Sequence, residues 1–293
     1  MKLSEIPIRD PFILPYDGIY YLFGTNGDFS QKGYGFLCRT SCDLVEWSDE
    51  KICFTPPEDF WADAQFWAPE VHEYNGKFYM FASFYRKDRD GMRRTQILCA
   101  DSPDGPYVPL SHPVTPEQWM CLDGTLYVEN GVPYMVFCHE WLQTINGEMC
   151  LQQLSQDLKE TVGEPVLLFC ATEQSSCVQT RSGGFITDGP WVYKTNDGKL
   201  LMLWSTFTEK GYCQAVAVSQ SGKVCGPWKQ CQTLLSEANG GHGMIFQTFE
   251  GDLYFTMHRP NSPGGAERAA LIPICEIQEE PYLQLEKKRE GRS

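Results

Sequence analysis

The sequence predicts an all-β fold, a five-bladed β-propeller with four strands in each blade, on three observations. Aromatic residues make up 13% of the 293 residues. Short runs of Tyr, Phe, Leu and Val alternate with Asp-Gly and Asn-Gly turns, which is typical of strands joined in hairpins. One plan also recurs five times along the chain: a polar residue, a short strand, a Gly-containing turn and an apolar strand. Such a repeat indicates a propeller.

The five repeats start at polar residues that we call anchors, spaced on average about 58 residues apart. The anchors are Asp10, Glu70, Asp123, Asp188 and His242. The repeats themselves span residues 10–25, 69–84, 122–141, 187–206 and 241–258. The alternative fold is a β-sandwich with similar hairpins, but a sandwich gives no reason for such even spacing.

The outer strands of the blades are predicted by a second, weaker repeat. Residues 99–107 and 217–228 share an Ala-x-Ser pattern followed by Gly-Pro and an aromatic residue, with a variant at 40–47. Each is read as a third strand, a turn and an outer fourth strand. Two further strands are expected in 270–278 and 282–287, so the ring is expected to close where the two termini meet.

Residues 1–293 are predicted to form a single domain, with a charged, solvated tail at about 287–293. The net charge of −14 disfavours nucleic acid and anionic membranes as partners. No apolar run reaches the roughly 18 residues of a membrane span, and the N-terminus lacks a signal-peptide pattern. The 13 cysteines are scattered without a CxxC pair. We therefore expect a cytoplasmic protein with reduced thiols and no zinc site.

The anchors are expected to converge at one end of the propeller axis, because the innermost strand of each blade lines that axis. Four carboxylates and a histidine would then share one small region, and buried acids are costly unless they are paired or functional. The antiparallel second strand of each repeat returns to the same face. Those strand ends carry polar and aromatic residues, at 25–26, 84–85, 139–141, 205–206 and 258–259. A face of this composition suits carbohydrate, through stacking on rings and hydrogen bonds to hydroxyls.

Five short motifs occur in order along the chain. They are Arg9-Asp-Pro-Phe-Ile with the following Asp-Gly-x-Tyr-Tyr-Leu-Phe-Gly-Thr, Trp67-Ala-Pro-Glu, Leu122-Asp-Gly, Asp188-Gly-Pro-Trp-Val-Tyr-Lys and Gly241-His-Gly. In the order and spacing of these motifs the chain resembles glycoside hydrolase family 43, five-bladed propeller enzymes that act on arabinose- and xylose-containing glycans.

The resemblance implies roles for several of these residues. Asp10 matches the general base that activates water, and Asp123 matches the aspartate that orients the acid and tunes its pKa. Asp188 occupies the position of the general acid. His242 matches the axial histidine, which in relatives helps to hold a cation or a water molecule. Arg268 follows in the last blade, where relatives place a substrate-binding arginine near the acidic cluster.

The chain departs from the family at the general acid. Relatives have glutamate in a Glu-Gly-Pro motif, whereas this chain has Asp188, whose reach is shorter by about 1.5 Å. Proton transfer requires contact within about 2.6–3.2 Å. A rival acid is Glu140, which ends an apolar strand on the expected open face. Both residues remain candidates, and Glu140 could instead pair with an arginine at the rim.

Three other residues each have two possible roles. Trp67 is either a core aromatic or a platform on which a sugar ring stacks, and we favour the platform. For Glu70 we favour a turn-capping role over a catalytic one. Glu267, near Arg268, could touch substrate or only hold its loop.

The resemblance implies an inverting glycosidase that removes terminal α-L-arabinofuranosyl residues from imported arabinose- and xylose-containing oligosaccharides. The alternatives are a β-D-xylosidase, an endo-arabinanase, or a propeller that binds sugar without cleaving it. No cofactor is expected to be required, although a structural calcium ion in the axial channel, held by His242 through water, is compatible with the family. The sequence indicates no oligomeric state.

Overall fold

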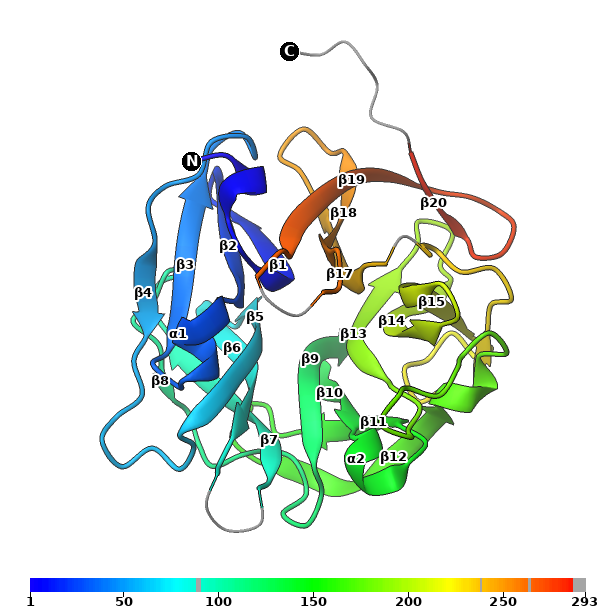
Figure 1. Ribbon diagram of the computed structural model, residues 1–293, viewed down its shortest axis with the longest axis horizontal. Coiled ribbons are helices and arrows are strands. Elements are labelled where there is room, and N and C mark those ends of the chain that lie inside the picture. The colour runs from blue at the N-terminus through cyan, green and yellow to red at the C-terminus, as the bar shows by residue number, and fades with distance from the viewer. Residues whose placement is uncertain (88–90, 238, 263–264, 287–293) are drawn as a thin grey trace.

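A computed structural model describes residues 1–87, 91–237, 239–262 and 265–286. Within these residues, five four-stranded antiparallel sheets surround a central axis, which confirms the predicted five-bladed propeller (Figure 1). Each sheet is formed by four strands that are consecutive in the chain. The predicted tail at 287–293 lies outside the described residues.

The strands run from the axis outwards in each blade. Blade 1 contains β1 (Arg9–Tyr16), β2 (Ile19–Thr25), β3 (Phe36–Ser41) and β4 (Lys51–Phe54). Blade 2 contains β5 (Ala64–Tyr74), β6 (Lys77–Tyr85), β7 (Arg93–Ala100) and β8 (Val108–Pro109). Blade 3 contains β9 (Cys121–Glu129), β10 (Val132–His139), β11 (Glu148–Leu154) and β12 (Thr161–Cys170). Blade 4 contains β13 (Asp188–Lys194), β14 (Leu200–Thr208), β15 (Gly211–Ser219) and β16 (Trp228–Gln230). Blade 5 contains β17 (Gly241–Gln247), β18 (Leu253–Arg259), β19 (Arg268–Glu276) and β20 (Leu283–Leu285).

Short helical segments lie between some of these strands. They are η1 (Leu3–Glu5), α1 (Gly27–Gln31), α2 (Trp141–Thr144) and η2 (Ala171–Glu173). Among the described residues no helix is both long enough and apolar enough to cross a membrane.

The predicted hairpin turns join the first two strands of blades 1 to 3. Asp17-Gly18, Asn75-Gly76 and Asn130-Gly131 all have positive φ at both residues. This is the backbone of a type I′ turn, whose twist matches that of the flanking strands, and Asn-Gly and Asp-Gly adopt it readily. The turns therefore fix the register of the inner hairpins, which in turn decides which residues reach the axis.

A bulge at the start of each inner strand shows which residues of the five blades are equivalent. The ladder between the first two strands shifts there in every blade. One residue at each shift has a left-handed backbone conformation, and these residues are Asp10 (φ 51°), Ala68 (φ 47°), Asp123 (φ 54°), Gly189 (φ 51°) and His242 (φ 53°).

Two of the five predicted anchors, Glu70 and Asp188, therefore do not occupy the equivalent bulge position. Ala68 takes the position expected for Glu70, and Gly189 takes the position expected for Asp188. Glu70 lies in the middle of β5, where it is buried and its Oε2 is 3.3 Å from Nε2 of His72. Asp188 is one residue before the bulge. Alignment on charge caused the error, because backbone conformation and not side-chain charge defines this position.

The blades are held together by apolar side chains packed between neighbouring sheets. Between blades 1 and 2 lie Phe36, Phe54, Phe66 and Phe84, with ring centroids 4.8–6.2 Å apart. Each fully buried ring of this kind contributes about 1.5–3 kcal/mol. The rigid ring of blades gives the axial residues fixed positions.

The ring closes where blade 5 meets the N-terminal segment. The amide of Ile8 donates to the carbonyl of Glu267 at 3.2 Å, and Pro7 forms an isolated bridge with Arg268. The Arg268 guanidinium donates to the backbone carbonyls of Ser4, Gly265 and Glu267. Arg268 therefore serves ring closure.

Candidate active site

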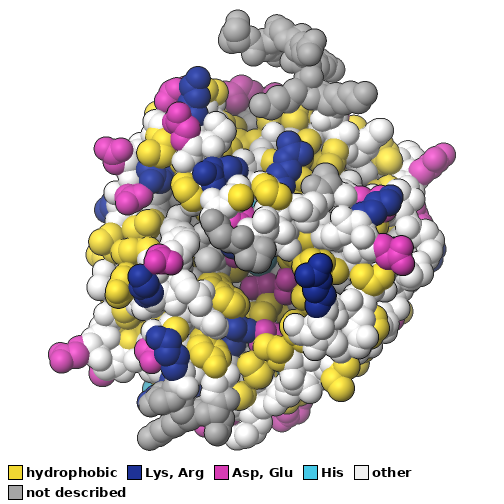
Figure 2. All heavy atoms as spheres, viewed as in Figure 1, with side chains coloured by type: hydrophobic (Ala, Val, Ile, Leu, Met, Phe, Trp, Pro, Cys, Tyr) yellow, Lys and Arg dark blue, Asp and Glu magenta, His cyan; other side chains and the backbone are white. Residues whose placement is uncertain are grey.

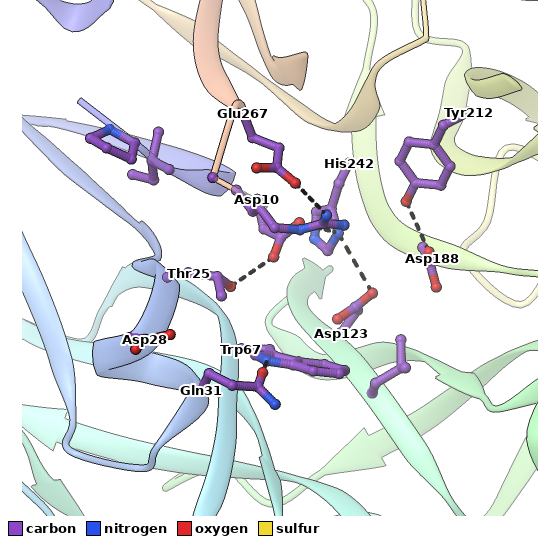
Figure 3. Close-up of a pocket in the computed structure, with 16 residues that line it drawn as sticks. Asp10, Thr25, Asp28, Gln31, Trp67, Asp123, Asp188, Tyr212, His242 and Glu267 are labelled. Atoms are coloured by element: carbon purple, nitrogen blue, oxygen red, sulfur yellow. Dashed lines mark hydrogen bonds and ion pairs between the residues drawn. The ribbon is translucent and has the colours of Figure 1, made fainter. Parts of the chain in front are cut away.

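A pocket of about 670 Å³ opens at the centre of the ring. Figure 2 shows acidic side chains on the floor of this hollow, and Figure 3 shows how the lining residues face one another. All five blades contribute walls. The side chains most relevant to chemistry are those of Arg9, Asp10, Thr25, Trp67, Asp123, Asp188, Tyr212, His242 and Glu267.

Three side chains surround the Asp10 carboxylate at the start of β1. Its Oδ2 accepts a hydrogen bond from the Thr25 hydroxyl at 2.7 Å. Its Oδ1 lies 3.3 Å from Nδ1 of His242 and 3.4 Å from Nδ1 of His258. Burial by itself raises the pKa of Asp10, but His242, His258 and Arg9 lower it by more, and the pKa falls to about 2. Asp10 is therefore ionised at neutral pH and can accept a proton.

His242 lies between two carboxylates (Figure 3). Its Nδ1 is 3.7 Å from Oδ2 of Asp123, in addition to its contact with Asp10. Burial lowers the pKa of His242, but the carboxylates of Asp10, Asp123 and Asp188 together raise it above its ordinary value. The carboxylates thus favour the charged form of the imidazole, which offsets part of their negative charge.

Asp123 and Asp188 are both buried at the pocket floor. Burial is the largest effect on each and raises both pKa values. The neighbouring charge of Asp123 raises the pKa of Asp188 further, to about 7. Asp123 Oδ2 also accepts a hydrogen bond from the amide of Gly189 at 3.0 Å, so it supports the backbone next to Asp188.

Asp188 is therefore the carboxyl group of the cluster that holds a proton near neutral pH. Its Oδ2 accepts a hydrogen bond from the Tyr212 hydroxyl at 2.9 Å. The cluster thus contains one carboxylate held ionised, Asp10, and one held protonated near neutrality, Asp188. Opposite protonation states on two acids are what a general base and a general acid require.

Glu140, the rival candidate for the acid, does not line this pocket. The chain leaves β10 at His139 and turns into α2, and Glu140 is buried in an ion pair with Arg93. Burial raises the pKa of Glu140, whereas Arg93 opposes that rise. Of the two readings that the sequence allowed, the arrangement matches the ion pair, although the arginine partner is buried instead of lying at the rim.

Trp67 lines the pocket, and its role as a platform for a sugar ring stays a prediction. Its indole Nε1 donates to Oε1 of Gln31 at 3.2 Å. The Arg93 guanidinium lies over the ring, 4.2 Å from its centroid, and Arg93 is not a lining residue. The ring is thus braced by α1 and by the Arg93–Glu140 pair.

Arg268, expected to bind substrate, does not line the pocket, because its guanidinium is used by the three carbonyl groups of the ring closure. The arginine of the pocket is Arg9. Its Nη1 donates to Oε1 of the buried Glu267 at 2.9 Å. Glu267 lines the pocket as well, so both readings of that residue, touching the site and holding a loop, fit its position.

The metal prediction has no direct counterpart. The described residues contain no group of three or more His, Cys, Asp or Glu side chains arranged to hold a metal ion. Nε2 of His242 is buried and lacks a hydrogen-bond partner, which suits a water molecule. A cation in the axial channel stays a prediction.

The sequence analysis missed Tyr212, which contacts Asp188. Tyr212 lies near the start of β15, the third strand of its blade, whereas the repeat that revealed the anchors covers only the first two strands. Its proximity to Asp188 depends on pairing across β14, and no local sequence signal reports it.

Comparison with known proteins identifies the family. The model of glycosyl hydrolases family 43 matches residues 4–282. A xylosidase/arabinosidase from Bacteroides ovatus is 24% identical, over 92% of this chain and 91% of the relative. A β-xylosidase from Xylanibacter ruminicola is 23% identical, over 73% of this chain and 76% of the relative. The crystal structure of an endo-arabinase from Bacteroides thetaiotaomicron VPI-5482 is 42% identical, with a TM-score of 0.88, and covers 95% of this chain and 98% of that chain. With its propeller fold and axial carboxyl cluster, this chain belongs to glycosyl hydrolases family 43 and is a glycoside hydrolase.

Proposed function

We propose that this enzyme removes terminal α-L-arabinofuranosyl residues from arabinose- and xylose-containing oligosaccharides, with inversion at the anomeric carbon. The observation that carries the proposal is the pocket itself. All five blades wall it, and the carboxyl cluster lies on its floor. A site enclosed in this way suits the end of a sugar chain, because a chain that continued in both directions would need a cleft open at two sides.

In the proposed reaction Asp10 is the general base and Asp188 is the general acid. Asp10 takes a proton from a water molecule while the water oxygen forms a bond to the anomeric carbon. The glycosidic carbon–oxygen bond breaks, and Asp188 gives its proton to the leaving oxygen. In an inverting enzyme the two carboxyl groups are about 6.5–9.5 Å apart, which leaves room for the water. The low pKa of Asp10 and the raised pKa of Asp188 support this assignment.

The remaining residues adjust the pKa of the acid or bind the sugar. Asp123 keeps the pKa of Asp188 raised and holds the backbone amide of Gly189. Trp67 offers an aromatic face on which a sugar ring stacks, and the pair of Arg9 and Glu267 offers hydrogen bonds to sugar hydroxyls.

A second candidate is endo-hydrolysis of arabinan. It is favoured by the 42% identity to a protein whose structure is described as that of an endo-arabinase. The two activities differ in their products. Terminal cleavage of linear arabinan releases arabinose from the start of the reaction, whereas internal cleavage releases a mixture of oligosaccharides.

A panel of nitrophenyl glycosides together with linear arabinan tests the proposal. We expect turnover of the α-L-arabinofuranoside above that of the β-D-xyloside, and arabinose as the early product. Preference for the xyloside would replace the arabinofuranosidase by a β-xylosidase. Early oligosaccharide products would favour endo action. Binding of these sugars without turnover of any would leave a sugar-binding propeller.

A further inference from the structure

A side chain at the end of the second strand of a blade commonly fastens that blade to the next one. The Thr25 hydroxyl accepts from the amide of Ala68 at 2.9 Å, and the Ser83 hydroxyl accepts from the amide of Asp123 at 2.8 Å. In the same way the Ser205 hydroxyl accepts from the amide of His242 at 2.7 Å. The acceptors pair with the residue just before the bulge of their own blade, so they occupy equivalent positions. In blade 3 the equivalent residue is Cys138, and Asp123 receives the amide of Gly189 instead.

His258 occupies this position in blade 5 and fastens the ring to blade 1. It pairs with Gly241, as Ser205 pairs with Asp188. Its Nδ1 accepts from the amide of Asp10 at 3.2 Å, so the fastening joins the last blade to the catalytic base. Nδ1 can accept only if it carries no proton, and Nε2 then donates to Oδ1 of Asn261 at 3.3 Å. The buried, neutral imidazole of His258 thus accepts an inter-blade hydrogen bond that hydroxyl groups accept between other blades.

The size of the imidazole matters because its ring reaches a second residue. The rings of His258 and Tyr212 stack with centroids 5.7 Å apart and planes 21° apart. Tyr212 in turn directs its hydroxyl at Oδ2 of Asp188. One continuous set of contacts therefore runs from the amide of Asp10 through two stacked rings to the carboxyl of Asp188. A serine at 258 would fasten the ring but would leave Tyr212 without this support.

We propose that His258 and Tyr212 act together as positioning residues, a stacked pair that fixes the base Asp10 and the acid Asp188 relative to each other. This inference rests on the proposed function of those two carboxyl groups. Because Tyr212 donates to Oδ2, the transferable proton of Asp188 lies on Oδ1. One of the two oxygens of this aspartate is thereby fixed, and the other is left for the leaving group.

Several groups besides Tyr212 influence the titration of the acid. Those that face Asp188 are Asp10 from β1, Asp123 from β9, Cys138 from β10 and His242 from β17. Those that face His258 are Asp10 and Arg9 from β1 and His242 from β17. None of them is changed by the substitutions below, so differences between variants report on the stacked pair.

Three variants and one control test the pair. Tyr212→Phe keeps the ring and removes the hydroxyl, His258→Ser keeps an acceptor for the Asp10 amide and removes the ring, and the third variant combines both. His139→Ser is the control, because His139 is also buried and stacked, on Trp119 at 4.2 Å, but does not line the pocket. Thermal melts establish that each variant is folded.

For hydrolysis of an arabino-oligosaccharide, we expect each single variant to lower kcat about 10- to 100-fold with little change in KM, because misplaced groups are costly at the chemical step. In Tyr212→Phe we expect the high-pH limb of the kcat profile to move to higher pH, because the Asp188 carboxylate loses a hydrogen-bond donor and its pKa rises. In the His258→Ser background, removing the hydroxyl is expected to cost nothing further, because the contact with Phe207 alone does not direct Tyr212 at Asp188. Independent, multiplicative losses would overturn the proposal. So would a His258→Ser variant that behaves like the His139→Ser control.

A measurement without turnover separates this inference from the proposed function. Carbon-13 NMR of the aspartate carboxyl groups follows their titration directly, and Asp188→Asn identifies the relevant signal. We expect the Asp188 carboxyl to titrate at higher pH in Tyr212→Phe than in the wild type. An unchanged titration would overturn the contact between the two residues, even in an active enzyme. Failure of the wild type on every glycoside would instead count against the proposed function alone.

Discussion

Nδ1 of His242 lies 3.3 Å from the carboxylate of Asp10. The contact links the neighbouring blades 5 and 1 beside the axis, and it places next to the proposed base an imidazole whose charged form the carboxylates favour. Together with Arg9, it explains why this buried carboxyl group has a low pKa, because burial alone raises the pKa of Asp10.

The base is tested by Asp10→Asn, which keeps the shape and removes the proton acceptor. We expect a loss of about 10²–10⁴-fold or more in kcat/KM. The loss should affect oligosaccharides and activated nitrophenyl glycosides alike, because water must be activated for either leaving group. Asp101→Asn is a matched control, since Asp101 forms an exposed ion pair with Lys77. Near-normal activity of Asp10→Asn would exclude Asp10 as the base.

The acid is tested by the leaving-group dependence of Asp188→Asn. A sugar hydroxyl is a poor leaving group and needs a proton, whereas an activated phenol hardly does. We therefore expect a far larger loss on an arabino-oligosaccharide than on a nitrophenyl glycoside. Equal losses on both substrates would remove Asp188 from the role of acid.

Glu140→Gln provides the comparison for the acid. This change removes the partner of the buried Arg93, and breaking a buried ion pair costs about 3–5 kcal/mol. We expect a lower free energy of unfolding in urea and no difference between leaving groups. A selective loss on the oligosaccharide would instead show that Glu140 supplies the proton.

The pH dependence of kcat/KM follows from the same two residues. Asp188 must be protonated to act, so activity on an oligosaccharide should fall as the pH rises through about 7. Asp10 stays ionised down to a pH of about 2, so the base should impose no falling limb between about pH 4 and 6. In Asp123→Asn a negative neighbour of Asp188 is lost, which lowers the pKa of Asp188. The high-pH limb should then move to lower pH, and a shift in the opposite direction would contradict the proposed tuning.

The binding platform is tested by Trp67→Ala and Trp67→Phe. Loss of the ring should raise KM about tenfold, corresponding to about 1.4 kcal/mol, while phenylalanine should retain most of the affinity. Trp119→Ala is the control, because Trp119 stacks on His139 outside the pocket. An unchanged KM in Trp67→Ala would show that this ring does not bind sugar.

The fold could be predicted because the repeat is local. Each inner hairpin is formed by residues that are consecutive in the sequence, and turns such as Asn75-Gly76 fix its register. The equivalence of Ala68 and Gly189 with Asp10 could not be predicted, because a left-handed backbone conformation leaves little trace at an alanine. Charge suggested the wrong neighbours, Glu70 and Asp188.

The site could be predicted only in part. Asp10, Asp123, Asp188, His242 and Trp67 all line the pocket, since they lie on or beside the inner strands. Residues placed by contacts between distant strands were beyond local patterns. Tyr212 reaches the site from a third strand, and the Arg268 guanidinium donates instead to the carbonyl groups of Ser4, Gly265 and Glu267.

The stereochemistry of hydrolysis tests the central claim most directly. Proton NMR of the first-formed sugar, recorded before mutarotation, reports the configuration at the anomeric carbon. If Asp10 activates water opposite the proton donated by Asp188, an α-L-arabinofuranoside must first give β-L-arabinofuranose. First-formed α-L-arabinofuranose would contradict the account, because retention requires a covalent intermediate on a carboxylate close to the acid.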